Sequence, residues 1–103
     1  MRRASRIDDN QNEIVAALRK AGAMVRIITQ GDGLPDLLVG YKGETILMEL
    51  KDGRKPPSAQ KLTEAEKKFH NEWTGGRLVV VNSVFMALQE LAQPEVANNT
   101  GSE

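Results

Sequence analysis

The chain has 103 residues, of which 40% are hydrophobic and 27% are charged, and it contains no cysteine. This length supports one domain with a modest core, and the lack of cysteine excludes disulfides and Cys-ligated zinc. Its 14 basic and 14 acidic residues give a formal net charge of zero, whereas dedicated DNA-binding domains are usually basic. No apolar run approaches the ~18 residues of a membrane span and no signal peptide is visible, so we expect a cytoplasmic protein.

The first predicted element is an amphipathic helix from Asp8 to Ala21. Its apolar residues recur at helical spacing, acidic residues lie near its start and Gly22 follows its end. Glu13 lies at the edge of the apolar stripe, and from this position its side chain can reach a site on a neighbouring sheet.

Three strands are predicted next, near Met24 to Thr29, Asp36 to Tyr41 and Glu44 to Lys51. The Lys42-Gly43 pair predicts a tight turn between the last two, which would form an antiparallel hairpin. The loop before the hairpin is crowded with Gly31, Gly33 and Pro35. Such a loop permits close approach of a ligand, or it forms a plain turn.

The hairpin predicts that Asp36, Glu49 and Lys51 converge. Side chains two apart on a strand point the same way, so Glu49 and Lys51 share a face, and Asp36 starts the strand whose partner they end. Two carboxylates suit a hard cation such as Mg²⁺, and the lysine can orient a water or neutralise developing charge. The alternative is an ordinary amphipathic strand whose solvated face carries Glu49 and Lys51.

A second helix is predicted from Thr63 to Trp73, with Thr63 and Glu66 spaced as a capping box. Ala65, Phe69 and Trp73 recur four apart, which favours core packing over stacking on nucleic-acid bases. His70, the single histidine, is interpreted as a surface residue of this helix.

The remaining pattern completes an α/β fold. Leu78 to Val81 form an apolar, mostly β-branched run within a strand from Arg77 to Asn82, which predicts burial on both faces, and Ser83 caps a last helix. The intervening helix favours a parallel crossover to the hairpin. We therefore expect a four-stranded mixed sheet flanked by helices, followed by a disordered tail over residues 94–103.

In their order, these motifs resemble the PD-(D/E)XK nuclease superfamily, and more narrowly the small phage and prophage VRR-NUC and Holliday junction resolvase-like domains. The core of the likeness is a helix with Glu13, then Gly-x-Gly-x-Pro-Asp36, then Glu49-x-Lys51. Flanking matches extend it over about residues 6–91: Arg6, Asp8, Asn10 and Gln11, then Asp52, Gly53, Lys55 to Ser58, Leu62 and Thr63.

The resemblance implies a restriction-endonuclease-like core, within a single domain spanning residues 1–93. It implies that Glu13, Asp36 and Glu49 bind Mg²⁺, that Mn²⁺ substitutes for it, and that Lys51 is the catalytic lysine. Relatives place a Gln or Lys on the following helix. Gln60, Glu66 and Lys67 are the candidate positions for it here, and the choice among them stays open, with Lys67 favoured as a phosphate contact.

The implied activity is metal-dependent hydrolysis of DNA, specific for branched structures such as Holliday junctions, by a homodimer in a bacterial or phage-infected cell. A basic arm over residues 1–7 and the loop after the third strand would contact DNA. The expected DNA-binding residues are Arg6, Arg54, Lys55, Lys61 and Lys67. Two alternatives stay open, namely a catalytically silent DNA-binding module of the same fold and a small interaction protein.

Overall fold

The computed structural model describes residues 10–93. Its elements, in chain order, are α1 (Gln11–Lys20), β1 (Met24–Ile27), β2 (Leu37–Tyr41), β3 (Glu44–Leu50), a short 3₁₀ helix η1 (Pro57–Gln60), α2 (Glu64–Glu72), β4 (Arg77–Val81) and α3 (Val84–Ala92). The predicted basic arm with Arg6, the first residues of the first predicted helix and the predicted tail over residues 94–103 lie outside the described residues.

The four strands form one mixed sheet in the order β1-β2-β3-β4. The first three are antiparallel, and β3 pairs in parallel with β4 after the crossover that contains α2. The predicted α/β class, hairpin and parallel crossover are thus confirmed. Lys42 and Gly43 both have positive φ (49° and 84°), as a two-residue turn that matches strand twist requires.

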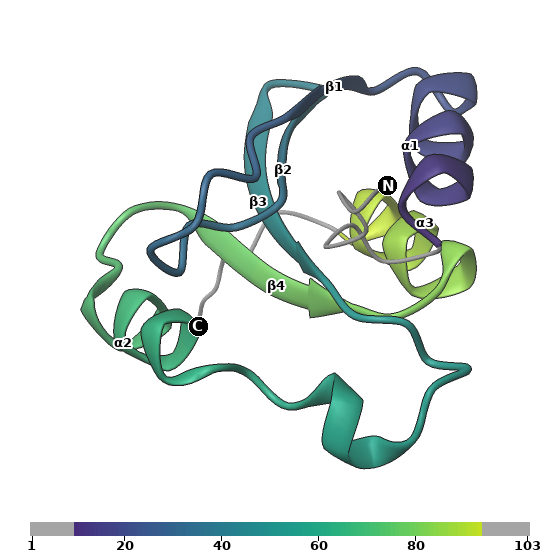
Figure 1. The fold of residues 1–103 in the computed structure, drawn as a ribbon. Coiled ribbons are helices and arrows are strands. Elements are labelled where there is room, and N and C mark those ends of the chain that lie inside the picture. Colours follow the sequence, from purple (N-terminus) through teal and green to yellow (C-terminus); the bar gives the residue numbers. More distant parts are fainter. Residues whose placement is uncertain (1–9, 94–103) are drawn as a thin grey trace, which may run out of the picture.

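Two helices cover one face of this sheet, and together they build the core. Figure 1 shows α1 and α3 side by side, on the side of the sheet away from α2. Ile14 and Leu18 of α1 and Ala87 of α3 are fully buried, because their helical spacing directs them at one surface. The sheet contributes alternate residues to the same cluster, including Val25, Leu37, Val39, Ile46, Met48, Leu50 and Val81.

The opposite face of the sheet is covered only in part, by α2. None of the residues of α2 is buried: Ala65 is exposed and Trp73 is 39% exposed. The prediction that Ala65, Phe69 and Trp73 pack into the core is therefore wrong, because the core lies on the face that α1 and α3 cover and α2 lies on the other face. The Phe69 and Trp73 rings stack on each other instead, with centroids 5.5 Å apart.

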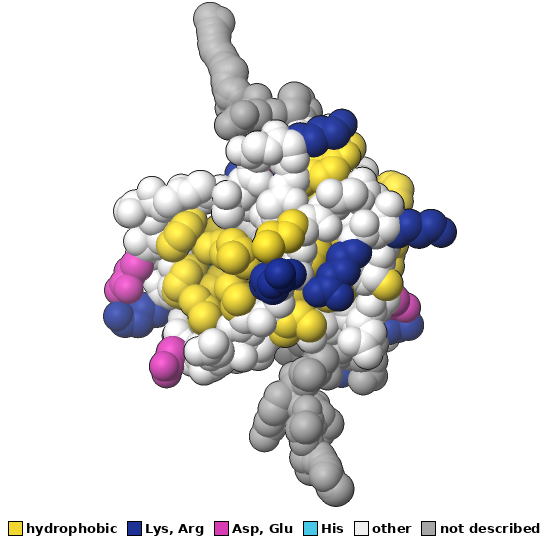
Figure 2. Space-filling view, turned by 90° about the horizontal axis from the view of Figure 1, so that it is seen from above, with side chains coloured by type: hydrophobic (Ala, Val, Ile, Leu, Met, Phe, Trp, Pro, Cys, Tyr) yellow, Lys and Arg dark blue, Asp and Glu magenta, His cyan; other side chains and the backbone are white. Residues whose placement is uncertain are grey.

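The prediction that β4 is buried on both faces is also wrong. Val81 is buried in the core, but Val80, which points to the opposite face, is 36% exposed. Other large apolar side chains are exposed at the free edge of the sheet, with Met24 and Ile27 of β1 among them. Figure 2 looks down on the β1 side and shows a broad hydrophobic area beside Lys and Arg side chains. Within residues 10–93, each helix is too short or too polar to cross a membrane.

Candidate active site at the ends of the paired strands

The hairpin brings Asp36 to the end of β3, as its register predicted. Asp36 immediately precedes β2, and its backbone N–H donates to the carbonyl of Met48 at 3.0 Å. Its Oδ2 accepts a hydrogen bond from the backbone N–H of Leu50 at 2.8 Å, and its Oδ1 accepts from the Thr29 hydroxyl at 2.9 Å. The carboxylate is thus held by the backbone of the residue between Glu49 and Lys51, and each oxygen keeps a further lone pair for another partner.

Glu49 is the most perturbed acid of this group. It is 2% exposed, and its Oε1 atom is buried without a hydrogen-bond partner. Burial, followed by repulsion from the carboxylates of Asp36 and Glu66, raises the pKa of Glu49 from its ordinary value of 4.5 to about 9. Such a strong shift at a charged cluster is more frequent at functional sites than elsewhere.

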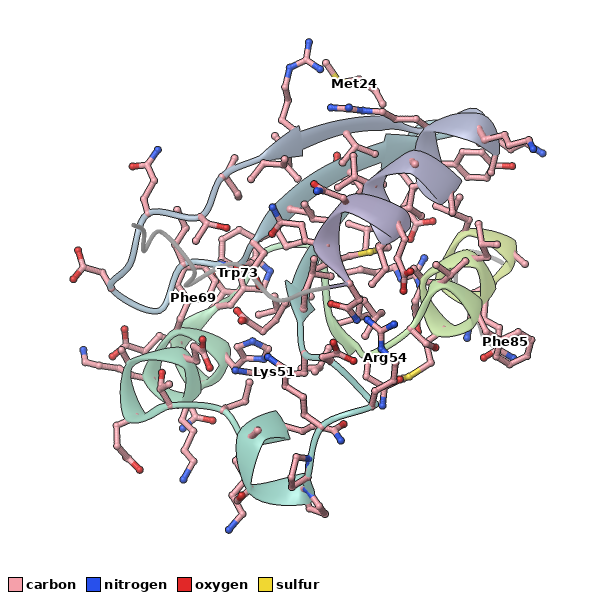
Figure 3. All side chains as sticks on the ribbon, turned by 45° about the vertical axis from the view of Figure 1, so that its right-hand side comes forward. Met24, Lys51, Arg54, Phe69, Trp73 and Phe85 are labelled. Carbon is pink, nitrogen blue, oxygen red and sulfur yellow. The ribbon has the colours of Figure 1, made fainter. Side chains whose placement is uncertain are left out.

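Lys51 supplies the positive charge of the cluster. Its Nζ lies 2.9 Å from Glu66 Oε1 and 4.0 Å from Glu49 Oε2, and Figure 3 shows it between α2 and Arg54. Glu49 and Lys51 share the face opposite to Leu50, as strand periodicity predicts. The lysine therefore connects the end of β3 to the first turn of α2.

Glu66 caps α2 and binds Lys51 at the same time. Its Oε1 also accepts the backbone N–H of Thr63 at 2.8 Å, while the Thr63 hydroxyl accepts the backbone N–H of Glu66 at 3.1 Å. This reciprocal pair is the predicted capping box, and it is confirmed. Burial opposes ionisation of Glu66, but the hydrogen bonds from Lys51 and Thr63 outweigh it and lower its pKa.

The glycine-rich loop holds α2 against this site. Gly33 has a positive φ of 79°, and a Cβ built on it would lie 2.2 Å from the carbonyl oxygen of Ala65. Only glycine permits this approach of loop backbone to helix backbone. The close packing explains why Gly33 is buried although residues 29–32, directly before it, are exposed.

Asn10 reaches the site from the amino-terminal side of α1. Its Nδ2 donates to the carbonyl oxygens of Lys51 at 3.0 Å and of Asn82 at 3.2 Å. The residue is 1% exposed. The sequence placed Asn10 only among the flanking matches, and no pattern indicated these contacts, because its partners lie 41 and 72 residues away.

Glu13 lies apart from the two buried carboxylates. Its side chain is 52% exposed and lies 3.8 Å from the guanidinium of Arg54. Arg54 also binds Asp52, and the resulting hydrogen bonds lower the pKa of that carboxyl group. Across residues 10–93, no three His, Cys, Asp or Glu side chains are placed to hold a metal ion together, so Glu13 forms no three-carboxylate cluster with Asp36 and Glu49.

The other predicted DNA-binding residues within the described part of the chain lie at the surface. Lys55, Lys61 and Lys67 are all exposed, and Lys67 Nζ lies 3.2 Å from Glu64. Of the three positions considered for the second helix, Glu66 is the one in contact with Lys51. Gln60 instead donates to the carbonyl of Lys55 at 2.7 Å and so braces the basic loop.

His70 differs from the surface residue that the sequence suggested. It is half-buried, and its Nε2 atom is buried without a hydrogen-bond partner. It follows Glu66 by one helical turn and therefore shares its side of α2. The spacing of four residues from Glu66 could have indicated this position of His70, but only the structure shows that Glu66 faces Lys51.

Asp36 and Glu49 fit a hard divalent cation. Mg²⁺ commonly takes one or two carboxylates and completes its shell with waters and phosphate oxygens, so a larger protein cluster is not required. The buried and unpartnered Oε1 of Glu49 and the raised pKa of Glu49 are both what a carboxylate site shows before a cation compensates its charge.

No family model, curated protein or solved structure matches the chain in the comparisons. The likeness to PD-(D/E)XK nucleases therefore rests on the sequence motifs alone.

Proposed function

We propose that this chain is a metal-dependent DNA endonuclease with a restriction-endonuclease-like core. The observation that carries the proposal is the buried Glu49, whose pKa is raised to about 9, held beside Asp36 and Lys51 at the end of β3. An ordinary solvated strand face does not bury an acid and a lysine beside a second carboxylate, because desolvation of charged groups is costly. Such costs are tolerated most often at functional sites.

In the proposed site Asp36 and Glu49 would hold Mg²⁺, for which Mn²⁺ would substitute. A bound Mg²⁺ would supply Lewis-acid stabilisation of the phosphate and a more acidic water. Glu13 stays a predicted third ligand, although its carboxylate lies at Arg54. The backbone N–H of Leu50 and the Thr29 hydroxyl fix Asp36, which limits the reorganisation needed when a ligand binds.

Lys51 would act on the attacking water or the phosphate. Its ammonium group is restrained by Glu66 at 2.9 Å, and so it offers a positioned donor where negative charge develops. The exposed Arg54, Lys55, Lys61 and Lys67 would bind neighbouring phosphates of the DNA, and they belong to the loop and helix that flank the site. Preference for branched DNA is part of the proposal and derives from the family resemblance.

A homodimer completes the proposal, because two sites are required to cut a four-way junction symmetrically. The exposed Met24 and Ile27 of the edge strand β1 are apolar surface that a second copy would cover. Light scattering of the purified protein measures this state.

Cleavage of labelled DNA by wild type and Lys51→Ala tests the activity. Four-way junction, flap, single-stranded and duplex substrates are compared with Mg²⁺, with Mn²⁺ and with EDTA. We expect metal-dependent cutting, fastest on a branched substrate, that Lys51→Ala abolishes while DNA affinity measured in Ca²⁺ stays within about twofold. The exposed Lys20→Ala is the matched control and should cut normally.

Three results would contradict the proposal. Binding without cutting on every substrate would favour the silent DNA-binding module, and neither cutting nor binding would favour an interaction protein. Cutting that survives Lys51→Ala would mean that another site is responsible.

A further inference from the structure

The geometry points to Asn10 as a positioning residue for Lys51, and this inference rests on the proposed function. Asn10 occupies the position directly before α1, where an asparagine side chain usually caps its own helix. It makes no such cap. Its amide instead donates to two carbonyl oxygens just past the C-terminal ends of β3 and β4.

The two carbonyls belong to adjacent segments that continue past the sheet. After Leu50, the last residue of β3, the backbone N–H of Lys51 donates to the carbonyl of Val81 at 3.0 Å, and that of Gly53 donates to the carbonyl of Asn82 at 3.0 Å. Asn10 Nδ2 spans these segments by donating one hydrogen to each carbonyl. The backbone of Lys51 is thereby fixed through its N–H and its C=O.

This arrangement has a local cost that the core does not explain. The helix gives up a favourable cap, and Asn10 Oδ1 is buried without a hydrogen-bond partner. Local rules of this kind are broken most often at functional sites. The arrangement fixes the backbone carbonyl of Lys51, whose ammonium group lies between Glu49 and Glu66.

An isosteric substitution separates positioning from simple stabilisation. Asn10→Asp keeps the shape but replaces the donor with an acceptor that faces two carbonyl oxygens. Asn12→Asp makes the same change two residues later, at an exposed position of α1. Val39→Ala, in the core and away from the site, is the control for lost stability, with its melting temperature compared with that of Asn10→Asp.

The first readout is the rate of chemical labelling at each lysine, and it does not depend on nuclease activity. Lysine side chains are labelled with a trace of acetic anhydride, and the rate at each lysine is read by mass spectrometry. Lys51, which is 9% exposed and paired with Glu66, should be among the slowest lysines in wild type. Asn10→Asp should raise the Lys51 rate several-fold and leave Lys20 and Lys68 unchanged, while Asn12→Asp and Val39→Ala should change none of them.

The second readout is cleavage, assayed well below every melting temperature. We expect Asn10→Asp to lower kcat by at least about tenfold, with KM within about twofold, because a displaced catalytic group loses transition-state binding. Val39→Ala should retain kcat. If Asn10→Asp does not fold, Asn10→Ala removes the donors without adding charge and carries the same comparison.

The outcomes separate the two claims. An unchanged Lys51 labelling rate in Asn10→Asp, or equal losses of kcat in Val39→Ala, would overturn the positioning role. If wild type cuts no DNA, the proposed function fails, whereas the labelling rate still shows whether Asn10 holds Lys51 in place.

Discussion

At the scale of single residues, the dominant feature is an acid held where its charge is poorly solvated. Glu49 lies between Asp36 and Glu66, and Lys51 stands closer to Glu66 than to Glu49. The lysine therefore compensates Glu66 better than it compensates Glu49, which agrees with the opposite directions of their pKa shifts. A cation bound by Glu49 and Asp36 would stabilise the ionised form of Glu49 and so lower its pKa.

The raised pKa of Glu49 predicts a specific dependence of stability on pH in the absence of metal. Between its ordinary value of 4.5 and about 9, the folded state keeps a proton that the unfolded chain releases. The stabilisation from Glu49 is thus fully present below pH 4.5 and is lost as the pH rises to about 9, by at most about 1.4 kcal/mol per pH unit.

Thermal unfolding in EDTA from pH 5 to pH 9 measures this effect. Glu49→Gln should become more stable relative to wild type as the pH rises, because its neutral amide never has to ionise. Mg²⁺ should stabilise wild type more at the higher pH and should not stabilise Glu49→Gln. Parallel pH profiles for the two proteins would show that Glu49 is ionised normally.

At the scale of elements, α2 belongs to the site rather than to the core. It is attached by the capping box at Thr63, by Glu66 and by the close approach of Gly33 to Ala65. None of its side chains is buried. Its position therefore depends on a few polar and backbone contacts, and a change in the loop should be felt at Lys51.

Gly33→Ala tests this coupling, with Gly31→Ala as its matched control. Both positions have positive φ, 79° and 82°, but a Cβ on Gly31 meets nothing within 4 Å. Each substitution should lower the free energy of unfolding by about 1–2 kcal/mol for the strained φ. Gly33→Ala should lower it by about 1–3 kcal/mol more, from the clash with α2.

Denaturant unfolding and DNA cleavage report the two effects of the Gly33 change. Activity should fall in Gly33→Ala beyond what its lower stability explains, and it should persist in Gly31→Ala. Equal stability and equal activity of the two variants would mean that the loop does not hold α2.

At the scale of the whole molecule, a net charge of zero conceals an uneven distribution. Acidic side chains are drawn into the site and into ion pairs, as in Arg77 with Glu44 and Glu90. Exposed basic residues follow β3 in the loop over residues 53–61. A neutral chain can thus present a basic surface beside its site.

The salt dependence of DNA affinity tests this surface. The affinity is measured by fluorescence anisotropy in the Lys51→Ala variant, which should bind DNA without cleaving it. Replacing Lys55 and Lys61 by alanine should reduce the slope of log K against log salt by about two, since each phosphate contact contributes about 0.9. Replacing Lys20 and Lys68, of which Lys68 pairs with Glu72, should leave the slope unchanged. Equal slopes in the two double variants would place the DNA elsewhere.

Local pattern was enough to predict much of this protein. Helical spacing, the Lys42-Gly43 turn, the capping box and strand alternation set the order of the elements, the mixed sheet and the approach of Asp36 to Glu49 and Lys51. Most of these features depend on residues that are close in sequence or paired in one hairpin, so periodicity and turn chemistry determine them. The parallel pairing of β3 with β4 is the exception, and the intervening helix indicated it.

Tertiary structure alone decided which side chains complete the site and which leave the core. Asn10 contacts Lys51 and Asn82, Glu66 contacts Lys51, and Trp73 is 39% exposed on a helix that has no buried residue. These outcomes depend on contacts across 15 to 72 residues. A sequence pattern records the spacing within an element, whereas the packing of distant elements determines which face of each is covered.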